Sequence, residues 1–341
     1  MKIVVGFSGG VDSAVTTRLL QQAGHEVHGL YMDNTNEAAR WEAEVSAERM
    51  GIELTVIDVK KELEEKVCRP FTESYLRGET PNPCILCNPS VKFRHLIALA
   101  DAIGAEKVAT GHYARAEGGA LYKGMPANDQ SYMLCRLTRE QVSRLILPLG
   151  VYEKTQVRAM AAEWGLDAAH KPDSMEICFI PDKNYIRWMS ERAELPGPGD
   201  FVFHGKVIGQ HEGIFRWTVG QRRPGLYEGR KLYVSAIDAK TNTVELALWE
   251  ELFQKELLAV DFNWLIDAPM GKILPATVRV RHTKWEEPRC AVMPEGESVV
   301  SIRCEEPVRA PAPGQSAVLY AGDRVLGGGF LTRRSEDTSK E

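Results

Sequence analysis

Two cysteines in a C-x-x-C spacing, Cys84 and Cys87, occur in the segment TPNPCILCNPSVKF, where prolines and asparagines surround them. Thiolates at this spacing serve as redox pairs, as ligands of zinc or of an iron–sulfur cluster, or as a nucleophile with a neighbour. Structural zinc needs two further ligands, and the chain has neither a second C-x-x-C pair nor an H-x₃₋₅-H pair. The pattern therefore disfavours zinc and leaves the other uses open.

A second segment suited to chemistry is SGGVDS, residues 8–13, which follows the apolar run KIVVGF. A glycine-rich turn between a strand and a helix directs backbone N–H groups and the positive helix end at one place, which suits phosphate. Gly9 and Gly10 permit close approach of the backbone, Asp12 and Ser13 can cap the helix, and Asp12 can also hold Mg²⁺. The segment is neither G-x-x-x-x-G-K-[ST] nor G-x-G-x-x-G, so the loop itself supplies no lysine for phosphate.

Composition indicates a globular protein, with 44% hydrophobic and 26% charged residues among 341. Seven irregularly spaced cysteines favour catalytic or metal-binding thiols in a reducing cytoplasm over a disulfide framework. We expect no signal peptide, because MKIVVGFSGG runs straight into a strand and a glycine turn, and no membrane span, because no uncharged apolar run reaches roughly 18 residues. The net charge of −5 means that a polyanionic partner must be held by local basic patches.

The elements that must position these segments alternate along the first half of the chain. Strand-like runs are followed by helix-like runs, several of which stop at a glycine, and this alternation predicts an α/β fold with a doubly wound, Rossmann-like parallel sheet. The predicted strands are 2–7, 26–32, 53–59 and 107–113, and the predicted helices are 12–23, 37–50, 90–103 and 153–164. Beyond LPGPGD, residues 195–200, short β-type runs between glycine turns predict small all-β modules.

Further motifs follow SGGVDS along the chain, in the order TPNPCILCN with VKF, TGHYA, NDQSYML, KPDSMEICF, GQHEG, TVGQRRPGL and PGQSAVLY. In this order, and up to Arg334, the chain resembles the tRNA-specific 2-thiouridylases of the pyrophosphate-loop ATP pyrophosphatase superfamily. It implies three parts: an adenine nucleotide α-hydrolase-like catalytic domain at 1–194, a central β-rich domain at 195–251, and a C-terminal β-barrel domain at 252–334. The polar end, 335–341, is expected to be disordered.

The resemblance implies that ATP and Mg²⁺ are used to adenylate the C2 oxygen of the wobble uridine in tRNA, with release of pyrophosphate. That oxygen is a poor leaving group, and adenylation converts it into AMP, which a sulfur nucleophile can displace. The chain would then be an ATP-dependent sulfurtransferase. The residues that match nucleotide-binding positions are Gly6, Phe7, Ser8, Gly9, Gly10, Val11, Asp12, Ser13, Met32 and Gly111.

For the sulfur step, the resemblance assigns Cys87 as the nucleophile and Cys178 as the carrier of a persulfide. An upstream sulfur donor, a cysteine desulfurase or a relay protein, would load Cys178. Cys84 departs from a common family pattern, which has Asp at this position. Two readings stay open: Cys84 is a helper beside a persulfide pair, or Cys84, Cys87 and Cys178 hold a [4Fe–4S] cluster that carries hydrosulfide. Lys92 and Arg94 are candidates for offsetting phosphate charge near the thiols.

The remaining matches concern tRNA. Asn82, Pro83 and Cys84 match the triplet that meets the target base. The positions that match tRNA contacts are His112, Asn128, Asp129, Gln130, Arg281, His282 and Gln315. We expect the other four cysteines, Cys68, Cys135, Cys290 and Cys304, to be small buried hydrophobic residues.

Two rival functions follow from parts of the same pattern. A pyrophosphate-loop ligase or amidating enzyme acting on a small molecule would need the loop but neither the distant cysteine pair nor the barrel. A non-catalytic RNA-binding protein with structural cysteines would leave Asp12 and Ser13 without a purpose. Turnover of ATP that depends on tRNA separates the three.

Overall fold

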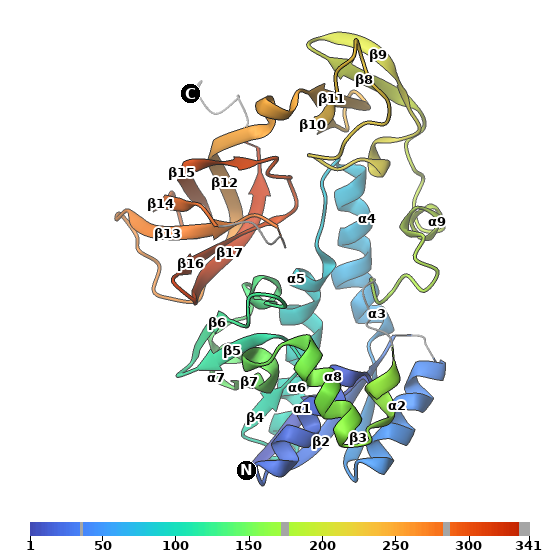
Figure 1. Cartoon of the computed structure of the whole chain (residues 1–341), viewed down its shortest axis with the longest axis vertical. Helices are drawn as coiled ribbons and strands as arrows, with labels where there is room; N and C mark the ends of the chain where they lie inside the picture. The colour runs from blue at the N-terminus through green and yellow to red at the C-terminus, as the bar shows by residue number, and fades with distance from the viewer. Residues whose placement is uncertain (35–36, 172–176, 282–286, 334–341) are drawn as a thin grey trace. The chain divides into compact units, whose positions relative to one another are not determined.

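The computed structural model describes residues 1–34, 37–171, 177–281 and 287–333 (Figure 1). These residues fall into two compact units. The first comprises the described residues within 1–67, 84–179 and 323–326, and the second those within 68–83, 180–322 and 327–333. The expected disordered tail, 335–341, lies outside the described residues. No helix in the described ranges is long and apolar enough to cross a membrane.

A five-stranded sheet organises the first unit, with strand order β3-β2-β1-β4-β7. Every neighbouring pair in it is parallel. The strands are β1 (Lys2–Gly6), β2 (Glu26–Asp33), β3 (Glu53–Asp58), β4 (Lys107–Ala109) and β7 (Leu145–Ile146). The order runs away from β1 in both directions, so the predicted doubly wound parallel sheet is confirmed. Such a sheet gathers ligands at the carboxyl ends of its strands, near the point where the winding reverses.

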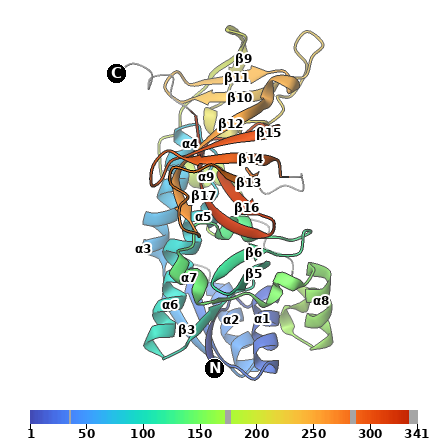
Figure 2. The ribbon, with the colours of Figure 1, turned by 90° about the vertical axis from the view of Figure 1, so that its left-hand side faces the viewer.

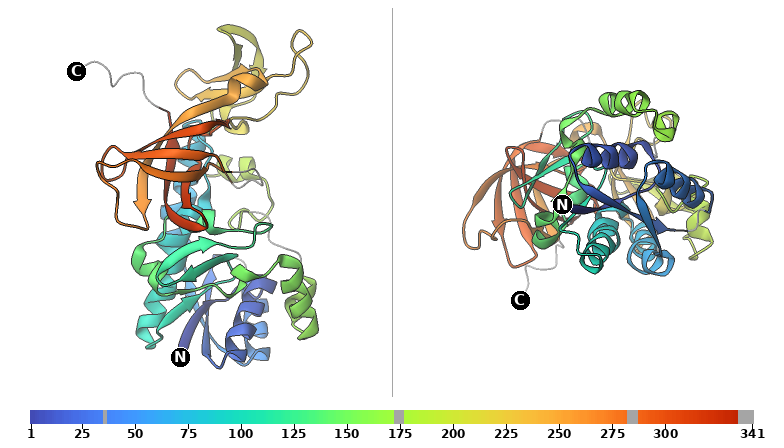
Figure 3. Two further views of the ribbon diagram at one scale, coloured as in Figure 1. Left: turned by 60° about the vertical axis from the view of Figure 1, so that its left-hand side comes forward. Right: turned by 90° about the horizontal axis from the view of Figure 1, so that it is seen from below.

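Helices cover this sheet on both faces. Seen from below in Figure 3, α1 in dark blue and α6 in blue-green lie on opposite sides of the strands. One side of the core joins β1 to α1 and α8, through residues such as Ile3, Val5, Val15 and Val157, which are inaccessible to solvent. The predicted helices correspond to α1 (Val11–Gln22), α2 (Glu37–Arg49), α6 (Phe93–Ala102) and α8 (Lys154–Glu163). Gly24, with φ of +79°, follows α1 in the left-handed conformation that commonly ends a helix.

The helical region around the C-x-x-C pair differs from the prediction. The predicted helix 90–103 is the last part of a helical stretch that begins at Pro83 and comprises α5 (Pro83–Cys87), the π-helical turn η2 (Asn88–Lys92) and α6. Periodicity could not reveal this, because a π turn inserts a residue and breaks the 3.6-residue repeat. Upstream, α3 (Lys60–Leu63), the π-helical turn η1 (Glu64–Cys68) and α4 (Arg69–Leu76) were not predicted.

Smaller elements complete the first unit. The hairpin β5 (Ala114–Glu117) and β6 (Ala120–Lys123) pairs antiparallel, and α7 (Arg139–Ser143) begins with a capping box in which Thr138 and Gln141 bond each other's backbone N–H groups. After the hairpin the chain returns toward the carboxyl end of β4, since the backbone N–H of Gln130 donates to the carbonyl of Tyr113 at 2.7 Å.

The second unit is rich in β-structure, as predicted. A four-stranded sheet has the order β10-β11-β8-β9, and six further strands form a barrel that closes by pairing β12 with β17 (Figure 2). The sheet strands are β8 (Gly199–Phe203), β9 (Lys206–His211), β10 (Tyr233–Asp238) and β11 (Thr243–Ala247). The barrel strands, in chain order, are β12 (Phe253–Trp264), β13 (Leu274–Arg279), β14 (Arg289–Pro294), β15 (Val300–Arg309), β16 (Ser316–Ala321) and β17 (Arg324–Thr332). The predicted C-terminal β-barrel is confirmed.

Aromatic side chains fasten α4 within the second unit. Phe71 packs edge-on against Trp188 of α9 (Tyr185–Ser190), with ring centroids 6.0 Å apart. Tyr75 stacks on Tyr185 at 5.3 Å. These contacts explain why a short helix of modest propensity persists, because most helical stability in proteins comes from the packing of a face.

Candidate active site

A pocket of about 300 Å³ opens at the carboxyl ends of β1, β2 and β4 in the first unit. Strand ends and the SGGVDS loop line it, and seven residues predicted to bind nucleotide are among the lining. These seven are Gly6, Phe7, Ser8, Asp12, Ser13, Met32 and Gly111, and the lining also includes Leu30, Tyr31, Lys92, Thr110, His112 and Gln130. Gly9, Gly10 and Val11 belong to the same loop and helix start without lining the pocket. The pocket lies where the fold predicts a ligand site.

Hydrogen bonds within the SGGVDS loop fix its conformation. The backbone N–H of Ser8 donates to Oγ of Ser13 at 3.2 Å, and that hydroxyl donates to the carbonyl of Gly10 at 3.0 Å. Gly9 has φ of +69°, and a Cβ there would stand 3.0 Å from Cα of Ala43, so a larger residue does not fit. The expected capping of α1 by Asp12 or Ser13 is wrong, because Gly10 occupies the N-cap and no side chain caps the helix. The first-turn N–H groups are therefore not consumed by a side-chain cap.

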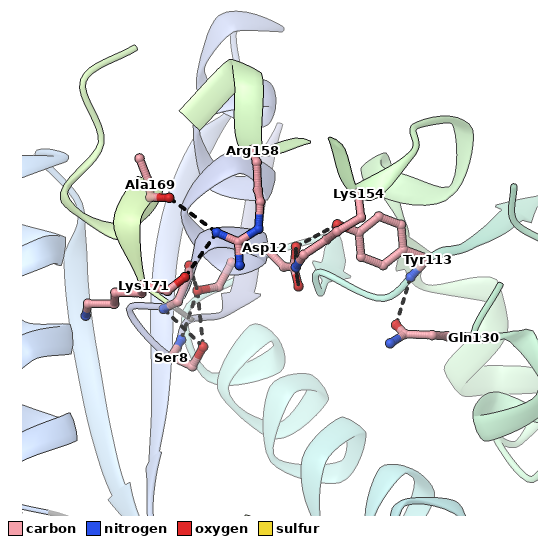
Figure 4. A network of polar contacts seen from close by, with 10 residues as sticks. Ser8, Asp12, Tyr113, Gln130, Lys154, Arg158, Ala169 and Lys171 are labelled. Atoms are coloured by element: carbon pink, nitrogen blue, oxygen red, sulfur yellow. Dashed lines mark hydrogen bonds and ion pairs between the residues drawn. The ribbon is translucent and has the colours of Figure 1, made fainter. Parts of the chain in front are cut away.

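Asp12 is held by two side chains from elsewhere in the chain (Figure 4). Nζ of Lys154 lies 2.7 Å from both carboxylate oxygens, and the hydroxyl of Tyr113 donates to Oδ1 at 2.7 Å. Gly111 makes this arrangement possible, since a Cβ on it would stand 2.8 Å from Cβ of Asp12. Lys154, the first residue of α8, was not predicted as a site residue, because nothing local in the sequence links it to a loop 142 positions earlier.

A second lysine reaches the same loop. Nζ of Lys171 donates to the carbonyl of Gly9 at 3.1 Å and pairs with Glu42 at 2.7 Å. Nη1 of Arg158 donates to the carbonyls of Ala169 and Lys171, at 3.3 and 3.1 Å, and so fixes the segment that carries this lysine (Figure 4). The cationic charge that the loop sequence lacks is thus supplied by α8 and by the chain that follows it.

Cys87 ends α5, directly before the π-helical turn η2. It is partly exposed, and burial raises the pKa of its thiol above the ordinary value. The charge of Lys92 and a hydrogen bond from the backbone N–H of Lys92 act in the opposite direction, whereas a negative charge on Cys84 would raise the pKa further. Because Lys92 also lines the pocket, one cation faces both the nucleotide site and the predicted nucleophile.

Cys178 belongs to the same electrostatic environment. Although the residue as a whole is exposed, burial of the thiol among protein atoms raises its pKa to about 11. Negative charge on Cys87 and on Cys84 raises this pKa as well, and Lys92 lowers it. The backbone carbonyl of Cys178 accepts from Nδ2 of Asn34 at 3.4 Å. Part of its motif, residues 172–176, lies outside the described residues.

The three thiols do not form a metal-binding set as they lie. Within the described ranges, no three His, Cys, Asp or Glu side chains are grouped so that they could hold a metal ion. The arrangement therefore gives the predicted [4Fe–4S] site no geometric support, although the charges of Cys84, Cys87 and Cys178 act on one another.

His112 lines the pocket beside Lys92. Its Nδ1 shares a hydrogen bond of 2.8 Å with Oγ1 of Thr110. Burial, and then the charge of Lys92, lower the pKa of His112 well below its ordinary value, so the imidazole is neutral near pH 7. Any contact that His112 makes with RNA would be a hydrogen bond or stacking, and not an ion pair with phosphate.

The segment 128–130, predicted to touch tRNA, is bonded into the first unit. The Asp129 carboxylate accepts from the backbone N–H groups of Gly124 and Ser131, at 2.8 and 3.1 Å, and from Oγ of Ser131 at 2.9 Å. Oε1 of Gln130 accepts from the backbone N–H of Tyr113 at 3.0 Å. Asp129 is only 5% exposed, so its side chain shapes the segment, and its role in tRNA contact stays a prediction.

The other predicted RNA-contacting residues belong largely to the second unit. Nε2 of Gln315 donates to the carbonyl of Thr80 at 2.8 Å, and Arg281 donates to the carbonyl of Ala310. Pro83 is buried and Cys84 is exposed at the start of α5. Asn82 is half-buried just before this helix, and His282 lies outside the described residues. Their roles at the target base and on tRNA stay predictions.

The four cysteines expected to be structural, Cys68, Cys135, Cys290 and Cys304, are all buried, as predicted. Cys290 and Cys304 face each other across β14 and β15 with free thiols. Burial raises the pKa of Cys135 and of Cys290 to about 12. These thiols are protonated near pH 7 and behave as apolar packing groups.

Comparison with known proteins assigns three consecutive family models to the chain. Residues 1–182 match the tRNA methyl transferase HUP domain, 192–247 the tRNA methyl transferase PRC-barrel domain, and 254–331 the aminomethyltransferase beta-barrel domain. The chain is 40% identical over 354 residues to the tRNA-specific 2-thiouridylase MnmA of Rickettsia akari (strain Hartford), covering 97% of this chain and 96% of that protein. It is 41% identical over 346 residues to the protein of the same name from Syntrophotalea carbinolica, covering 96% and 98%.

Among solved structures, an NMN synthetase from Francisella tularensis matches with 20% identity and a TM-score of 0.35. That match covers 50% of this chain and 66% of the synthetase. The likeness is too low to support an argument about function.

Proposed function

The chain belongs to the tRNA-specific 2-thiouridylase family, and from this premise we propose that it is an ATP-dependent sulfurtransferase that places sulfur at C2 of a wobble uridine in tRNA. The observation that carries the proposal is the position of Lys92. Its side chain lines the pocket formed by the SGGVDS loop, and its charge acts on both Cys87 and Cys178. One cation thus acts on both a nucleotide site and two thiols. This arrangement suits a reaction that first activates an oxygen and then replaces it with sulfur.

The phosphate side of the pocket suits cleavage of ATP between its α- and β-phosphates. In the proposed first step, the C2 oxygen of the uridine attacks the α-phosphorus, and the bond to the β-phosphate breaks to release pyrophosphate. Oriented N–H groups and nearby cations stabilise the charge that develops on a departing phosphate. The first turn of α1 provides the N–H groups, and Lys154 and Lys171 stand at the same loop.

Magnesium fits this site as an ion that arrives with ATP. Mg²⁺ keeps several waters and is commonly held by one or two carboxylates together with substrate phosphates. Asp12 supplies the carboxylate that lines the pocket. A carboxylate offers about four acceptor positions. The contacts with Lys154 and Tyr113 use fewer than that, so Asp12 can accept a further ligand. Asp12 would hold the ion, which supplies charge neutralisation for the leaving pyrophosphate. Because the thiols lack a three-ligand arrangement, we derive no step through an iron–sulfur cluster.

For the second step, a donor such as a cysteine desulfurase or a relay protein would leave a persulfide on Cys178. Its terminal sulfur attacks C2, and the bond from C2 to the AMP oxygen breaks. Cys87 then attacks Sγ of Cys178, the bond to the transferred sulfur breaks, and a Cys87–Cys178 disulfide forms. A reductant of the thiol class must reopen this disulfide before the next turnover. Lys92 favours the thiolate form of both cysteines, as the attacking sulfur requires.

The test uses purified protein, ATP, a persulfide donor and tRNA that carries a wobble uridine. We expect AMP and pyrophosphate to form with tRNA, and mass spectrometry of the tRNA to detect exchange of one oxygen for sulfur. If AMP forms with a free amino acid or another small acid and not with tRNA, the ligase function is correct. If tRNA binds and no AMP forms under any condition, the protein is a non-catalytic RNA-binding protein.

A further inference from the structure

Two side chains connect the segment 128–130 to the carboxylate of Asp12 in the nucleotide loop. The first is Tyr113. Its backbone N–H donates to Oε1 of Gln130 at 3.0 Å, and its carbonyl accepts from the backbone N–H of Gln130 at 2.7 Å. From the same residue, the phenol hydroxyl donates to Oδ1 of Asp12 at 2.7 Å. Tyr113 therefore bonds to the segment through its backbone and to the loop through its side chain.

The second connection is Lys154. Its backbone N–H donates at 2.8 Å to the amide oxygen of Asn128, with the amide oriented so that this oxygen faces Lys154. Its ammonium group lies 2.7 Å from both oxygens of Asp12 and 5.6 Å from the centre of the Tyr113 ring. Two residues of one segment, Asn128 and Gln130, thus reach the same carboxylate by separate routes.

Neither route is a flexible surface contact. Tyr113 is 3% exposed, and the Lys154 and Asp12 side chains keep 21% and 34% of their exposure. A charged hydrogen bond that is partly shielded from water is stronger and shorter than a neutral one. Gly111 leaves Asp12 little space for an alternative position, because even a Cβ there would come within 2.8 Å. A displacement of the segment 128–130 must therefore be transmitted to Asp12.

We propose that Tyr113 and Lys154 are positioning residues that couple occupancy of the segment 128–130 by tRNA to the placement of Asp12, and so to the affinity of the pocket for ATP. The inference rests on the proposed function, since it takes tRNA as the ligand of this segment. Coupling between two sites is reciprocal, so tRNA tightens the binding of ATP by the same factor by which ATP tightens the binding of tRNA.

The test measures binding without chemistry. The dissociation constant of an ATP analogue that cannot be cleaved between its α- and β-phosphates is determined by calorimetry with and without a tRNA that carries the wobble uridine, so that no adenylation takes place. We expect the wild-type protein to bind the analogue on the order of 5- to 150-fold more tightly when this tRNA is present, the usual range for coupled sites.

Tyr113→Phe removes the hydroxyl that reaches Asp12 and leaves the backbone bonds to Gln130. We expect the factor by which tRNA tightens binding of the ATP analogue to fall several-fold toward unity in this variant. The dissociation constant of the analogue without tRNA should change by less than that factor. Tyr152→Phe is the matched control, because Tyr152 lies two residues before Lys154 and packs against the hydrophobic cluster that contains Tyr113. It should keep the full gain.

The outcomes separate the coupling from the proposed function. An undiminished gain in Tyr113→Phe, in protein that melts at the wild-type temperature, overturns the coupling while leaving thiolation intact. If Tyr113→Phe fails to fold, Lys154→Gln is measured in the same way and must show the same loss of gain. Absence of any tRNA-induced gain in the wild type also overturns the coupling. Failure of the proposed function is recognised separately, because wild-type protein would then transfer no sulfur to uridine-containing tRNA.

Discussion

The phosphate loop and the cysteine region of the first unit are built in opposite ways. The loop is fixed by short hydrogen bonds and close backbone packing, with Asp12 held by Lys154 and Tyr113 and with Gly9 pressed against Ala43. The thiols of Cys84 and Cys178 belong to exposed residues, and Cys87 is partly exposed. In the cysteine region, burial is the main influence on the pKa of Cys87 and of Cys178 and raises it, whereas the charge of Lys92 lowers it. We infer from this difference that adenylation depends on a preformed geometry, whereas sulfur transfer depends on the protonation of thiols whose pKa burial and Lys92 shift in opposite directions.

The largest expected effect comes from removing the sulfur chemistry altogether. Cys87→Ser and Cys178→Ser should each lower thiolation of tRNA below detection, because a hydroxyl neither carries a persulfide nor attacks one. Adenylation should persist, since the phosphate loop is untouched. Chromatography of AMP and mass spectrometry of the tRNA measure the two steps. Cys304→Ala, a buried cysteine of the barrel, is the control and should keep both steps; loss of adenylation in the two serine variants would show that the regions are not separable.

Asp12→Asn tests the other region. It keeps the shape of the side chain but loses the charge that pairs with Lys154 and that the proposed Mg²⁺ contact needs. We expect AMP formation to fall on the order of 10²- to 10³-fold, a typical cost of removing one preorganised electrostatic group. The rate at which iodoacetamide alkylates Cys87 should stay within about twofold of wild type, because the effect is local to the loop. Unchanged AMP formation would remove Asp12 from the site.

Lys92 is where the two regions meet, and its loss should produce a pH-dependent defect. Lys92 lowers the pKa of Cys87 and of Cys178, so Lys92→Met should raise both and leave less thiolate near neutrality. Sulfur transfer should slow by about tenfold at pH 7.5, for a pKa shift of about one unit. Since raising the pH restores the thiolate, the defect should shrink as pH increases.

Two controls accompany this pH profile. Arg94→Met removes a nearby exposed cation that pairs with Glu62 and should leave the profile in place. The pKa of His112, which Lys92 also lowers, should rise in Lys92→Met and can be followed by NMR. A defect of equal size at every pH would mean that Lys92 acts by binding phosphate or tRNA and not through the thiols.

The smallest effect is expected at Cys84, and it decides between the two sulfur chemistries. In the persulfide reaction, Cys84→Asp introduces the residue that the resemblance implies at this position and should keep or raise the thiolation rate. Cys84→Ser should change it by less than about threefold, because the side chain is exposed and carries no sulfur in that reaction. Iron and sulfide assays under anaerobic conditions run in parallel. Iron bound in the wild type and lost together with activity in Cys84→Ser would establish the cluster instead.

Local sequence patterns predict the features that depend on neighbouring residues, namely secondary structure and turns. The alternation of strands and helices predicted the parallel sheet, and the glycines of residues 8–13 predicted a turn that the structure places beside a pocket at the carboxyl ends of the strands. That this turn binds phosphate stays a prediction. Lys154 and Lys171 could not be predicted, because their relation to the loop arises only when α8 packs beside α1. The absence of a lysine from the loop was correctly noted, yet the sequence did not indicate where the charge would come from.

The region around Cys87 shows a second limit of local patterns. A helix was predicted from residue 90, whereas the helical stretch begins at Pro83 and passes through a π turn at 88–92. The π turn brings the N–H of Lys92 to the sulfur of Cys87, a hydrogen bond that 3.6-residue periodicity does not anticipate. Proximity in sequence predicts that Lys92 offsets phosphate charge, which stays a prediction, and the structure adds that its charge acts on Cys87 and Cys178.

The most direct test of the account follows the α-phosphate of ATP in the Cys178→Ser protein, which is expected to stop between the two steps. The protein is incubated with ATP labelled at the α-phosphorus and with tRNA that carries a wobble uridine, and the RNA is separated under denaturing conditions. We predict label on the tRNA, mapped by nuclease digestion to the wobble nucleotide, with release of pyrophosphate and no gain of sulfur. Label that appears only in free AMP or on a small molecule, with the tRNA unlabelled, would contradict adenylation of uridine by this pocket.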